Sequence, residues 1–426
     1  MLTALSCVAY RDAMFAWPKE IVLRFDSLVR ESTRSDPQWT ADFLQWLRTS
    51  QRYPALVGAA AFASERLAHG EHGMSRQVVN SVLRHPADPG HLLAHWTSTY
   101  GSQVPKPVKR GVADAAVRLY SPSALRYDTD GHHLDLPNFI NKLTRWRGGI
   151  PTPRPFRFGD VIALTHPVAR TAEQGELFRL AIDRRYGRAP AVAVEPPDSV
   201  EDLVAGLKRF DRSGIPFESA MAVASRLRTE DSGLLPLRFV SARRGLRTTR
   251  WLPALEIAAG RHVSTLPEIP GRTLIVVDQD TDDAIVFALT LAQRCASVDV
   301  VADNHRRFPV VPGESPLTGL TRWRLGDMVG DAPCGHGATV HMFDRHDRVV
   351  VVEREISDVE DIDVPVPVPV YGWQVAHHTC HYCPDGQHDP GPNRAHFFGV
   401  SDAAYGAIPV IEGVRAGRWP WSLASH

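Results

Sequence analysis

The first 268 residues alternate short amphipathic stretches with prolines and glycines, a pattern that predicts helices. Apolar residues recur at spacings of three and four, as on one buried helical face, in two stretches: Leu92, Leu93, Trp96 and Tyr100, then Val108, Val112, Ala116, Leu119 and Tyr120. A further helix is predicted from Pro37, with Asp36 as its cap. Short amphipathic helices without an exact repeat predict a helical solenoid or ring of the HEAT type, in which each helix pair buries its face on its neighbours.

From about residue 270 the pattern changes to apolar runs that are typical of buried strands. These runs are GRTLIVVDQD (271–280), VDVVA (298–302) and DRVVVVE (347–353), and a helical stretch from Ala284 to Arg294 separates the first two. Alternating strands and helices predict a doubly wound parallel sheet, with ligands at the carboxyl ends of its strands. The segment VPVPVPV (364–370) cannot be a central strand, because its prolines donate no ladder hydrogen bonds. The predicted fold class is multidomain α + α/β, with domains at 1–268 and 269–426.

The formal net charge of zero conceals two regions of opposite sign. From Ile269 onward the chain has 12 arginines, no lysine and 21 acidic residues, a net charge of −9, which leaves +9 for residues 1–268. A basic region of this kind is the usual electrostatic signature of polyanion binding. No apolar run approaches the roughly 18 residues that span a bilayer, and the first residues lack the basic region of a signal peptide. The five cysteines form no disulfide framework, so we expect a cytoplasmic protein without membrane contact.

Six strings, all in the same order, resemble the TROVE-module family, which comprises the Ro autoantigen proteins and their bacterial relatives. The strings are LLAHWTSTYGSQVPKPVKRGVADAAVRLYSPSALRYD (92–128), RFGDVIALTHP (157–167), LFRLAIDRRYGR (177–188), LPLRFVSARR (235–244), LPEIPGRTLIVVD (266–278) and HFFGVSDAAYGAIPVIEGVRAGRWPW (396–421). The resemblance implies a ring of HEAT-like helical repeats followed by a von Willebrand A-type doubly wound α/β domain. It also implies a monomeric, non-catalytic protein that binds small noncoding RNA and single-stranded RNA ends and requires no cofactor. Since some bacterial relatives guide an exoribonuclease, such an enzyme is an expected partner. The segment 129–155 departs from these relatives as an insertion.

The first group of candidate RNA-binding residues lies in and around the predicted helix that begins near Pro107. Binding to phosphates needs converging cations, and a sequence-tolerant grip on single strands adds aromatic stacking. The group consists of Lys106, Lys109, Arg110, Arg118, Arg126, Tyr127 and, in the string LTHP, His166. By resemblance, this region corresponds to the family's RNA-contacting helices. The alternative is a solvated polar face, because Asp114 stands four residues from both Arg110 and Arg118 and could pair with each.

A second group is formed by four arginines, Arg243, Arg244, Arg247 and Arg250. On a helix, the spacings of four and three would place residues 243, 247 and 250 in one basic stripe without an acid inside it. Phosphate would offset the repulsion within such a stripe. The alternative is that these arginines pair with the acidic domain that begins some 20 residues later.

The acidic end of the first predicted strand offers two kinds of chemistry. Asp278, Asp280 and Asp282 occupy the places of the Asp-x-Ser-x-Ser metal site in A-type domains, and their hard oxygens could bind a divalent cation, Mg²⁺ or Ca²⁺. The downstream loop APCGHGAT (332–339) and Arg354 depart from that site. The same string also resembles the start of phosphatases of the haloacid-dehalogenase type, with Asp278 as nucleophile and Asp280 as acid/base. That chemistry normally uses a downstream lysine, and none follows Lys208, so we expect no enzyme activity.

Histidines surround a C-x-x-C string in HHTCHYCPDGQH (377–388). Cys380 and Cys383 with His377 and His388 are a candidate zinc site. The alternative is a polar loop with free thiols, and the resemblance implies no zinc here. For the whole chain, the alternative to RNA binding is a protein-interaction scaffold whose RNA and metal sites have degenerated.

Overall fold

The computed structural model describes residues 19–50, 52–128, 156–186, 188, 200–278, 281–302, 304–326, 328, 339, 341–353, 364–365, 367–375, 393–398, 400 and 402–420. The chain forms two compact units, whose main parts are Asp12–Glu195 and Pro196–Trp419. We call them the first and the second unit and describe each by itself. Neither contains, in the residues described, a helix that is both long and apolar enough to cross a bilayer.

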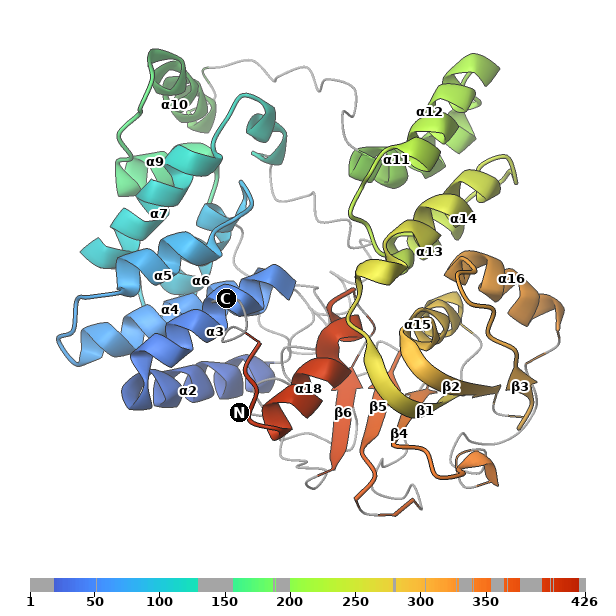
Figure 1. Cartoon of the computed structure of the whole chain (residues 1–426). Coiled ribbons are helices and arrows are strands. Elements are labelled where there is room, and N and C mark those ends of the chain that lie inside the picture. The colour runs from blue at the N-terminus through green and yellow to red at the C-terminus, as the bar shows by residue number, and fades with distance from the viewer. Residues whose placement is uncertain are drawn as a thin grey trace. The chain divides into compact units, whose positions relative to one another are not determined.

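The first unit is a stack of helices (Figure 1). They are α2 (Lys19–Ser35), α3 (Pro37–Ser50), α4 (Arg52–Ala68), α5 (Ser75–Val82), α6 (Asp88–Thr99), α7 (Lys106–Leu119), the 3-10 helix η1 (Ser123–Tyr127), α9 (Phe158–Thr165) and α10 (Ala172–Arg185). Contacts run along the stack: α2 and α3 pack on α4, α4 on α5, α5 on α7, α7 on α9, and α9 on α10. Each helix therefore buries its apolar face on its neighbours, as expected of helical repeats.

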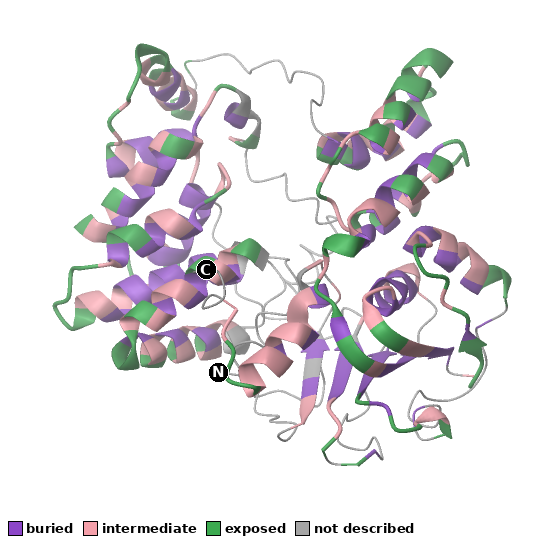
Figure 2. Ribbon diagram, viewed as in Figure 1, coloured by how far each residue is buried: buried purple, intermediate pink, exposed green. Residues whose placement is uncertain are grey.

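The sequence explains the helices of the first unit locally. The Asp36 carboxylate accepts a hydrogen bond of 2.9 Å from the Trp39 N–H and so caps α3. Most of the apolar positions predicted for α6 and α7 are buried, for example Trp96 and Val112, whereas Tyr100 and Leu119 are half-buried. Figure 2 shows the buried stretches of the helices in this unit. Gly111 lets α7 approach α5 closely, since a Cβ there would lie 2.7 Å from the Arg76 carbonyl oxygen and 2.8 Å from the Val79 Cβ.

The second unit begins with four helices that share one core with the α/β part. They are α11 (Val200–Ser213), α12 (Phe217–Thr229), α13 (Pro236–Arg243) and α14 (Leu252–Arg261), followed by the 3-10 helix η2 (Val263–Thr265). α13 packs on α15 (Asp282–Ala292), and α14 packs on α16 (Pro316–Leu325). The change from helices to strands falls at Ile269, where β1 begins, whereas the contacts divide the chain between Glu195 and Pro196.

The sheet of the second unit has the strand order β3-β2-β1-β4-β5-β6. Its strands are β1 (Ile269–Asp278), β2 (Cys295–Ala302), β3 (Arg307–Phe308), β4 (Arg348–Glu353), β5 (Val370–Gln374) and β6 (Arg394–Phe398), and the 3-10 helix η4 (Asp402–Gly406) and α18 (Ala407–Arg415) follow. All neighbouring strands are parallel except β3, which runs antiparallel to β2 at the edge.

Both faces of the central strands are buried, which explains their continuous apolar runs. On β4, Val350 and Val352 belong to the core shared with the helices, and Val349 and Val351 to a second core on the opposite face. The proline-rich segment behaves as predicted, because its described residues before Val370 form no strand. The predicted fold class, helical repeats followed by a doubly wound α/β domain, is confirmed. Since the strand order reverses between β1 and β4, their carboxyl ends form the edge where ligands of such sheets usually bind.

Candidate nucleic-acid interface

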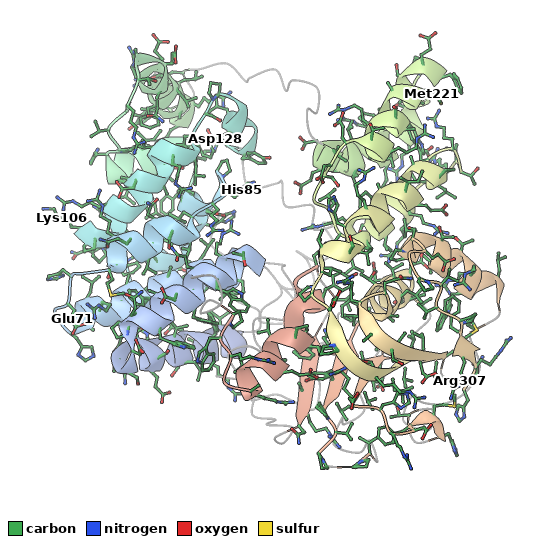
Figure 3. All side chains as sticks on the ribbon, in the orientation of Figure 1. Glu71, His85, Lys106, Asp128, Met221 and Arg307 are labelled. Carbon is green, nitrogen blue, oxygen red and sulfur yellow. The ribbon has the colours of Figure 1, made fainter. Side chains whose placement is uncertain are left out.

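The first turns of α7 carry three cations. Lys106 and Arg110 are exposed and Lys109 is half-buried, and Lys106 projects outward from the start of the helix (Figure 3). The first turn contains no acidic residue, and Pro105, at the N-cap, provides no side-chain hydrogen bond. The amino end of a helix is the positive end of its dipole, where cations are unfavourable and anions are stabilised. This cluster of Lys106, Lys109 and Arg110, which we call the α7 cation cluster, is therefore suited to an anion such as phosphate.

The carboxylate that could have neutralised this cluster is bound elsewhere. Asp114 accepts two hydrogen bonds from Arg76 of α5, at 2.6 and 2.9 Å. Across the described ranges, no carboxylate forms an ion pair with Lys106, Lys109 or Arg110. In the described structure Asp114 therefore pairs with Arg76, and not with Arg110 and Arg118 as the alternative expected.

Arg118 differs from the α7 cation cluster. Its guanidinium donates to the carbonyl oxygens of Asn80 and Leu83, at 2.9 and 2.7 Å, and so binds the end of α5. Burial, together with the nearby charge of Arg84, lowers the pKa of Arg118. These contacts give Arg118 a structural role between α5 and α7.

The remaining candidates of the first unit lie at opposite ends of α9. Tyr127 is 36% exposed, and its ring stands edge-on to His85 with the ring centroids 4.4 Å apart. The next residue, Asp128, accepts a hydrogen bond of 2.8 Å from the Phe158 N–H at the start of α9. His166 is exposed and ends α9 in the left-handed conformation, with φ of 50°. α9 separates the two places by about 12 Å of helix, and the side chain of Arg126 lies outside the described residues.

The expected stripe of Arg243, Arg247 and Arg250 is wrong, because α13 ends at Arg243 and a turn follows. Arg243 donates to the Leu317 carbonyl oxygen and the Thr321 hydroxyl of α16, at 3.3 and 3.4 Å. Arg244 forms an ion pair with Asp283 of α15. The Arg244–Asp283 pair agrees with the alternative, pairing with the acidic domain, whereas Arg243 binds uncharged groups of that domain.

A buried carboxylate that the sequence analysis missed holds this turn. Asp211 of α11 accepts hydrogen bonds from the Arg247 N–H at 2.5 Å, the Thr248 hydroxyl at 2.5 Å and the Trp251 indole at 2.9 Å. Arg250 lies 4.0 Å from the same carboxylate, and its guanidinium is 4.5 Å from the centre of the Trp251 ring. The side chain of Arg247 is exposed and its backbone is fixed by Asp211.

At the carboxyl end of β1, the described part of the predicted metal site is neutralised by arginine. Asp282 forms an ion pair of 2.8 Å with Arg324 of α16. The side chains of Asp278 and Asp280 lie outside the described residues, as does Arg354. The last residue of β4, Glu353, is buried and stands in register with Asp278. Glu353 was not among the predicted site residues, although its place at the end of an apolar strand could have indicated it.

Among the residues that the structure describes, no group of histidine, cysteine, aspartate and glutamate is arranged to hold a metal ion. The candidate zinc ligands Cys380, Cys383, His377 and His388 lie outside the described residues, as does the insertion 129–155. Cation and zinc binding therefore stay predictions.

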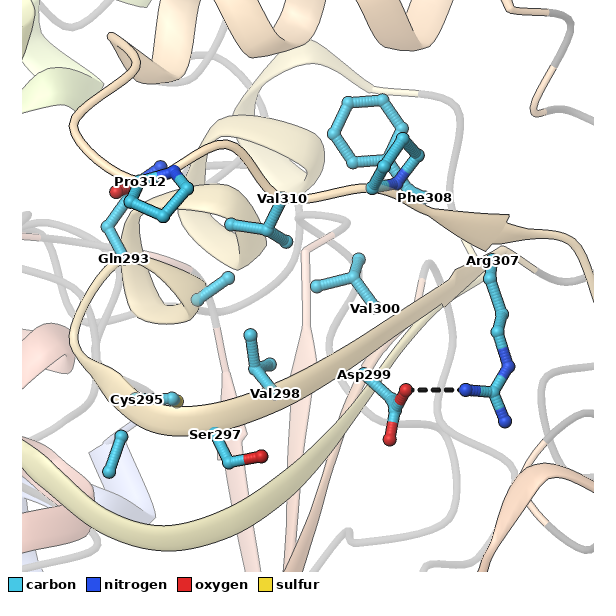
Figure 4. A pocket seen from close by; sticks show the side chains of 13 residues that line it. Gln293, Cys295, Ser297, Val298, Asp299, Val300, Arg307, Phe308, Val310 and Pro312 are labelled. Atoms are coloured by element: carbon cyan, nitrogen blue, oxygen red, sulfur yellow. Dashed lines mark hydrogen bonds and ion pairs between the residues drawn. The ribbon is translucent and has the colours of Figure 1, made fainter.

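A groove of about 620 Å³ follows the outer edge of β2 (Figure 4). Val298, Val300, Phe308 and Val310 are among the apolar side chains that line it. Its one carboxylate, Asp299, binds Arg272 at 2.8 Å, Arg307 at 2.6 Å and His346 at 3.0 Å. Burial raises the pKa of the Cys295 thiol to about 11, so this lining thiol is not a ready nucleophile at neutral pH.

Helical repeats in the first unit and a doubly wound sheet with one antiparallel edge strand in the second define a helical-repeat protein with a doubly wound α/β domain. No family model and no curated protein matches the sequence. Among solved structures, the chain is similar to the crystal structure of the Deinococcus radiodurans RO (RSR) protein, with a TM-score of 0.57 and 15% sequence identity over 89% of this chain and 92% of that chain. At this identity the likeness shows a shared fold. The architecture that the resemblance to the Ro family implied, helical repeats followed by an α/β domain, is thereby confirmed.

Proposed function

We propose that this chain is an RNA-binding protein of the ribonucleoprotein type and that the α7 cation cluster contacts RNA phosphates. The observation that carries the proposal is that Lys106, Lys109 and Arg110 gather at the positive end of a helix while Asp114 is bound by Arg76. Like charges within one turn repel each other. Phosphate groups of RNA would offset this repulsion and release counterions on binding.

The charge of the chain and its fold support the same function. Residues 1–195 have 25 basic and 18 acidic residues, so most of the positive excess belongs to the first unit. The Ro-type fold adds the expectation that the ligands are small noncoding RNA and single-stranded RNA ends, and that an exoribonuclease is a partner. The protein acts by binding and not by catalysis.

Binding of a fluorescent single-stranded RNA tests the proposal. A variant with Lys106, Lys109 and Arg110 all changed to glutamine should lose about two units of slope in a plot of log affinity against log salt, since each phosphate contact on a single strand contributes about 0.7. At low salt its affinity should fall by about tenfold or more. Asp114→Asn, which removes a carboxylate four residues from Arg110 and releases Arg76, should change affinity in the opposite direction.

A matched control removes three cations from the second unit. Lys208, Arg209 and Arg212 also lie within five residues, at the end of α11. Changing them to glutamine should leave the salt slope nearly unchanged. Equal losses in the two triple variants would contradict a local phosphate site. If the purified chain retains no RNA but captures proteins after ribonuclease treatment, the scaffold hypothesis replaces this one.

A further inference from the structure

The carboxyl end of α10 presents an exposed tyrosine between arginines. Tyr186 is 57% exposed, and the guanidinium carbons of Arg185 and Arg188 lie 5.4 and 5.1 Å from the centre of its ring. Both distances fall within the range of cation–π contacts. The backbone fixes the arrangement, because the N–H groups of Tyr186 and Arg188 both donate to the Asp183 carbonyl oxygen, at 3.2 and 2.8 Å.

The two arginines differ in their other contacts. Arg185 forms an ion pair of 2.7 Å with Asp160 in the first turn of α9, which ties the end of α10 to α9. Arg188 is exposed and pairs with no carboxylate in the part of the chain that the structure describes. Its charge therefore remains available to an anion beside the Tyr186 ring.

A second exposed aromatic residue lies at the same end of α9. Asp128, next to Tyr127, is hydrogen-bonded to the Phe158 N–H at the start of α9, and Arg185 is bound to Asp160, two residues further along in the same turn. The charges of Arg157 and Arg184 also act on Asp128, whose pKa burial raises. Tyr127 and Tyr186 are thus each next to a residue that is bound to the first turn of α9.

We infer that Tyr186 and Arg188 bind an unpaired nucleobase and the phosphate next to it, so that the end of α10 is a contact site for single-stranded RNA. This inference rests on the proposed function and adds a second site to it. An aromatic ring stacks on any base that is free of its partner, whereas the bases of a duplex are covered. An acidic peptide would use the arginines alone and would gain little from the ring.

The test measures the affinity of a ten-nucleotide uridine strand for variants of the full chain. Tyr186→Ala should weaken binding by about 5- to 150-fold, the range expected for one stacked base, and Tyr186→Phe should bind like the unchanged protein. Phe217→Ala is the matched control, because Phe217 is 77% exposed on α12 and no arginine lies over its ring in the described structure. This control should not change binding.

A strand of ribose phosphates without bases separates stacking from charge. The unchanged protein should bind this abasic strand less tightly than the uridine strand, and Tyr186→Ala should bind the abasic strand as well as the unchanged protein does. Arg188→Gln should instead reduce the salt slope by about 0.7 on both strands.

The inference is overturned if Tyr186→Ala binds the uridine strand normally, or if it loses equal affinity for the uridine strand, the abasic strand and a polyglutamate peptide. A normal Tyr186→Ala beside a defective α7 triple variant would leave the proposed function standing. If the unchanged protein binds no RNA, the function and this site both fail.

Discussion

The Asp211 carboxylate should stabilise the second unit strongly, because it fixes the turn between α13 and α14. Its Oδ1 accepts from the Thr248 hydroxyl and the Trp251 indole, and its Oδ2 accepts from the Arg247 N–H. Trp251 is fully buried, at 0% exposure. An alanine at position 211 would leave these donors without an acceptor, and each hydrogen bond to a charged group contributes about 1.5–3 kcal/mol.

We expect Asp211→Ala to lower the free energy of unfolding by about 3–5 kcal/mol, less than the sum of three bonds because the contributions are not additive. Asp211→Asn should cost about 1–3 kcal/mol, since its amide oxygen can still accept from Thr248 and Trp251 while its NH₂ group meets the Arg247 N–H. Urea unfolding measures both values. Hydrogen exchange of the Arg247 amide should show that the loss is local to the turn.

The pH dependence gives an independent check of the same carboxylate. Burial opposes ionisation of Asp211, but the hydrogen bonds from Thr248, the Arg247 N–H and Trp251 outweigh it and lower its pKa to about 2. Since the folded pKa lies below the unfolded value of 3.8, the stabilisation is complete above about pH 4 and is lost as the pH falls towards 2. The stability difference between the unchanged protein and Asp211→Asn should therefore be constant from about pH 7 to 5 and should shrink below pH 4. Equal urea midpoints for Asp211→Ala and the unchanged protein at neutral pH would refute this account of the turn.

Two further predictions concern α7 and the end of β1. Gly111→Ala should destabilise the chain by about 1–3 kcal/mol in urea unfolding, because the added Cβ would meet the Arg76 carbonyl oxygen at 2.7 Å. The control Gly175→Ala in α10 has its nearest neighbour at 3.8 Å and should stabilise by about 0.5–1 kcal/mol; equal effects would contradict the close α5–α7 approach. Asp278→Asn should leave any hydrolysis of p-nitrophenyl phosphate unchanged, since the phosphatase alternative lacks a lysine after Lys208, and loss of turnover would restore that alternative.

Local patterns predicted the elements of this fold well. The spacing of Trp96 and Val112 within their helices, the Asp36 cap and the β-branched run of β4 depend on residues close together in the chain, and each has the predicted structure. Further along the chain, the alternation of strands and helices was enough to predict a doubly wound sheet. The sequence also placed three cations near the start of α7.

Partners from distant segments could not be predicted in this way. Arg76 and Asp114 are 38 residues apart, and the Arg247 N–H binds Asp211 from 36 residues away. Nothing in the local spacing indicates that Asp114 faces α5 and not Arg110. The prediction of a helical arginine stripe was wrong for a similar reason. The chain turns after Arg243, and this turn is held by contacts with α11 and α16 that the local sequence does not indicate.

The two arginine- and lysine-rich segments show why the number of cations alone is a poor guide to RNA contact. Both have several positive charges within eight residues, yet the segment 243–250 has carboxylates from other elements beside it, Asp283 at Arg244 and Asp211 at Arg250. In the described structure no carboxylate pairs with the α7 cation cluster, and Asp114 of the same helix is bound by Arg76 of α5. A cation that already has a buried or bidentate partner adds little binding free energy when a phosphate approaches. At an unpaired cation at the positive end of a helix, a phosphate both neutralises the charge and relieves the repulsion. Phosphate binding by this chain should therefore be concentrated in the first unit, on helices whose acids are bound by neighbouring arginines.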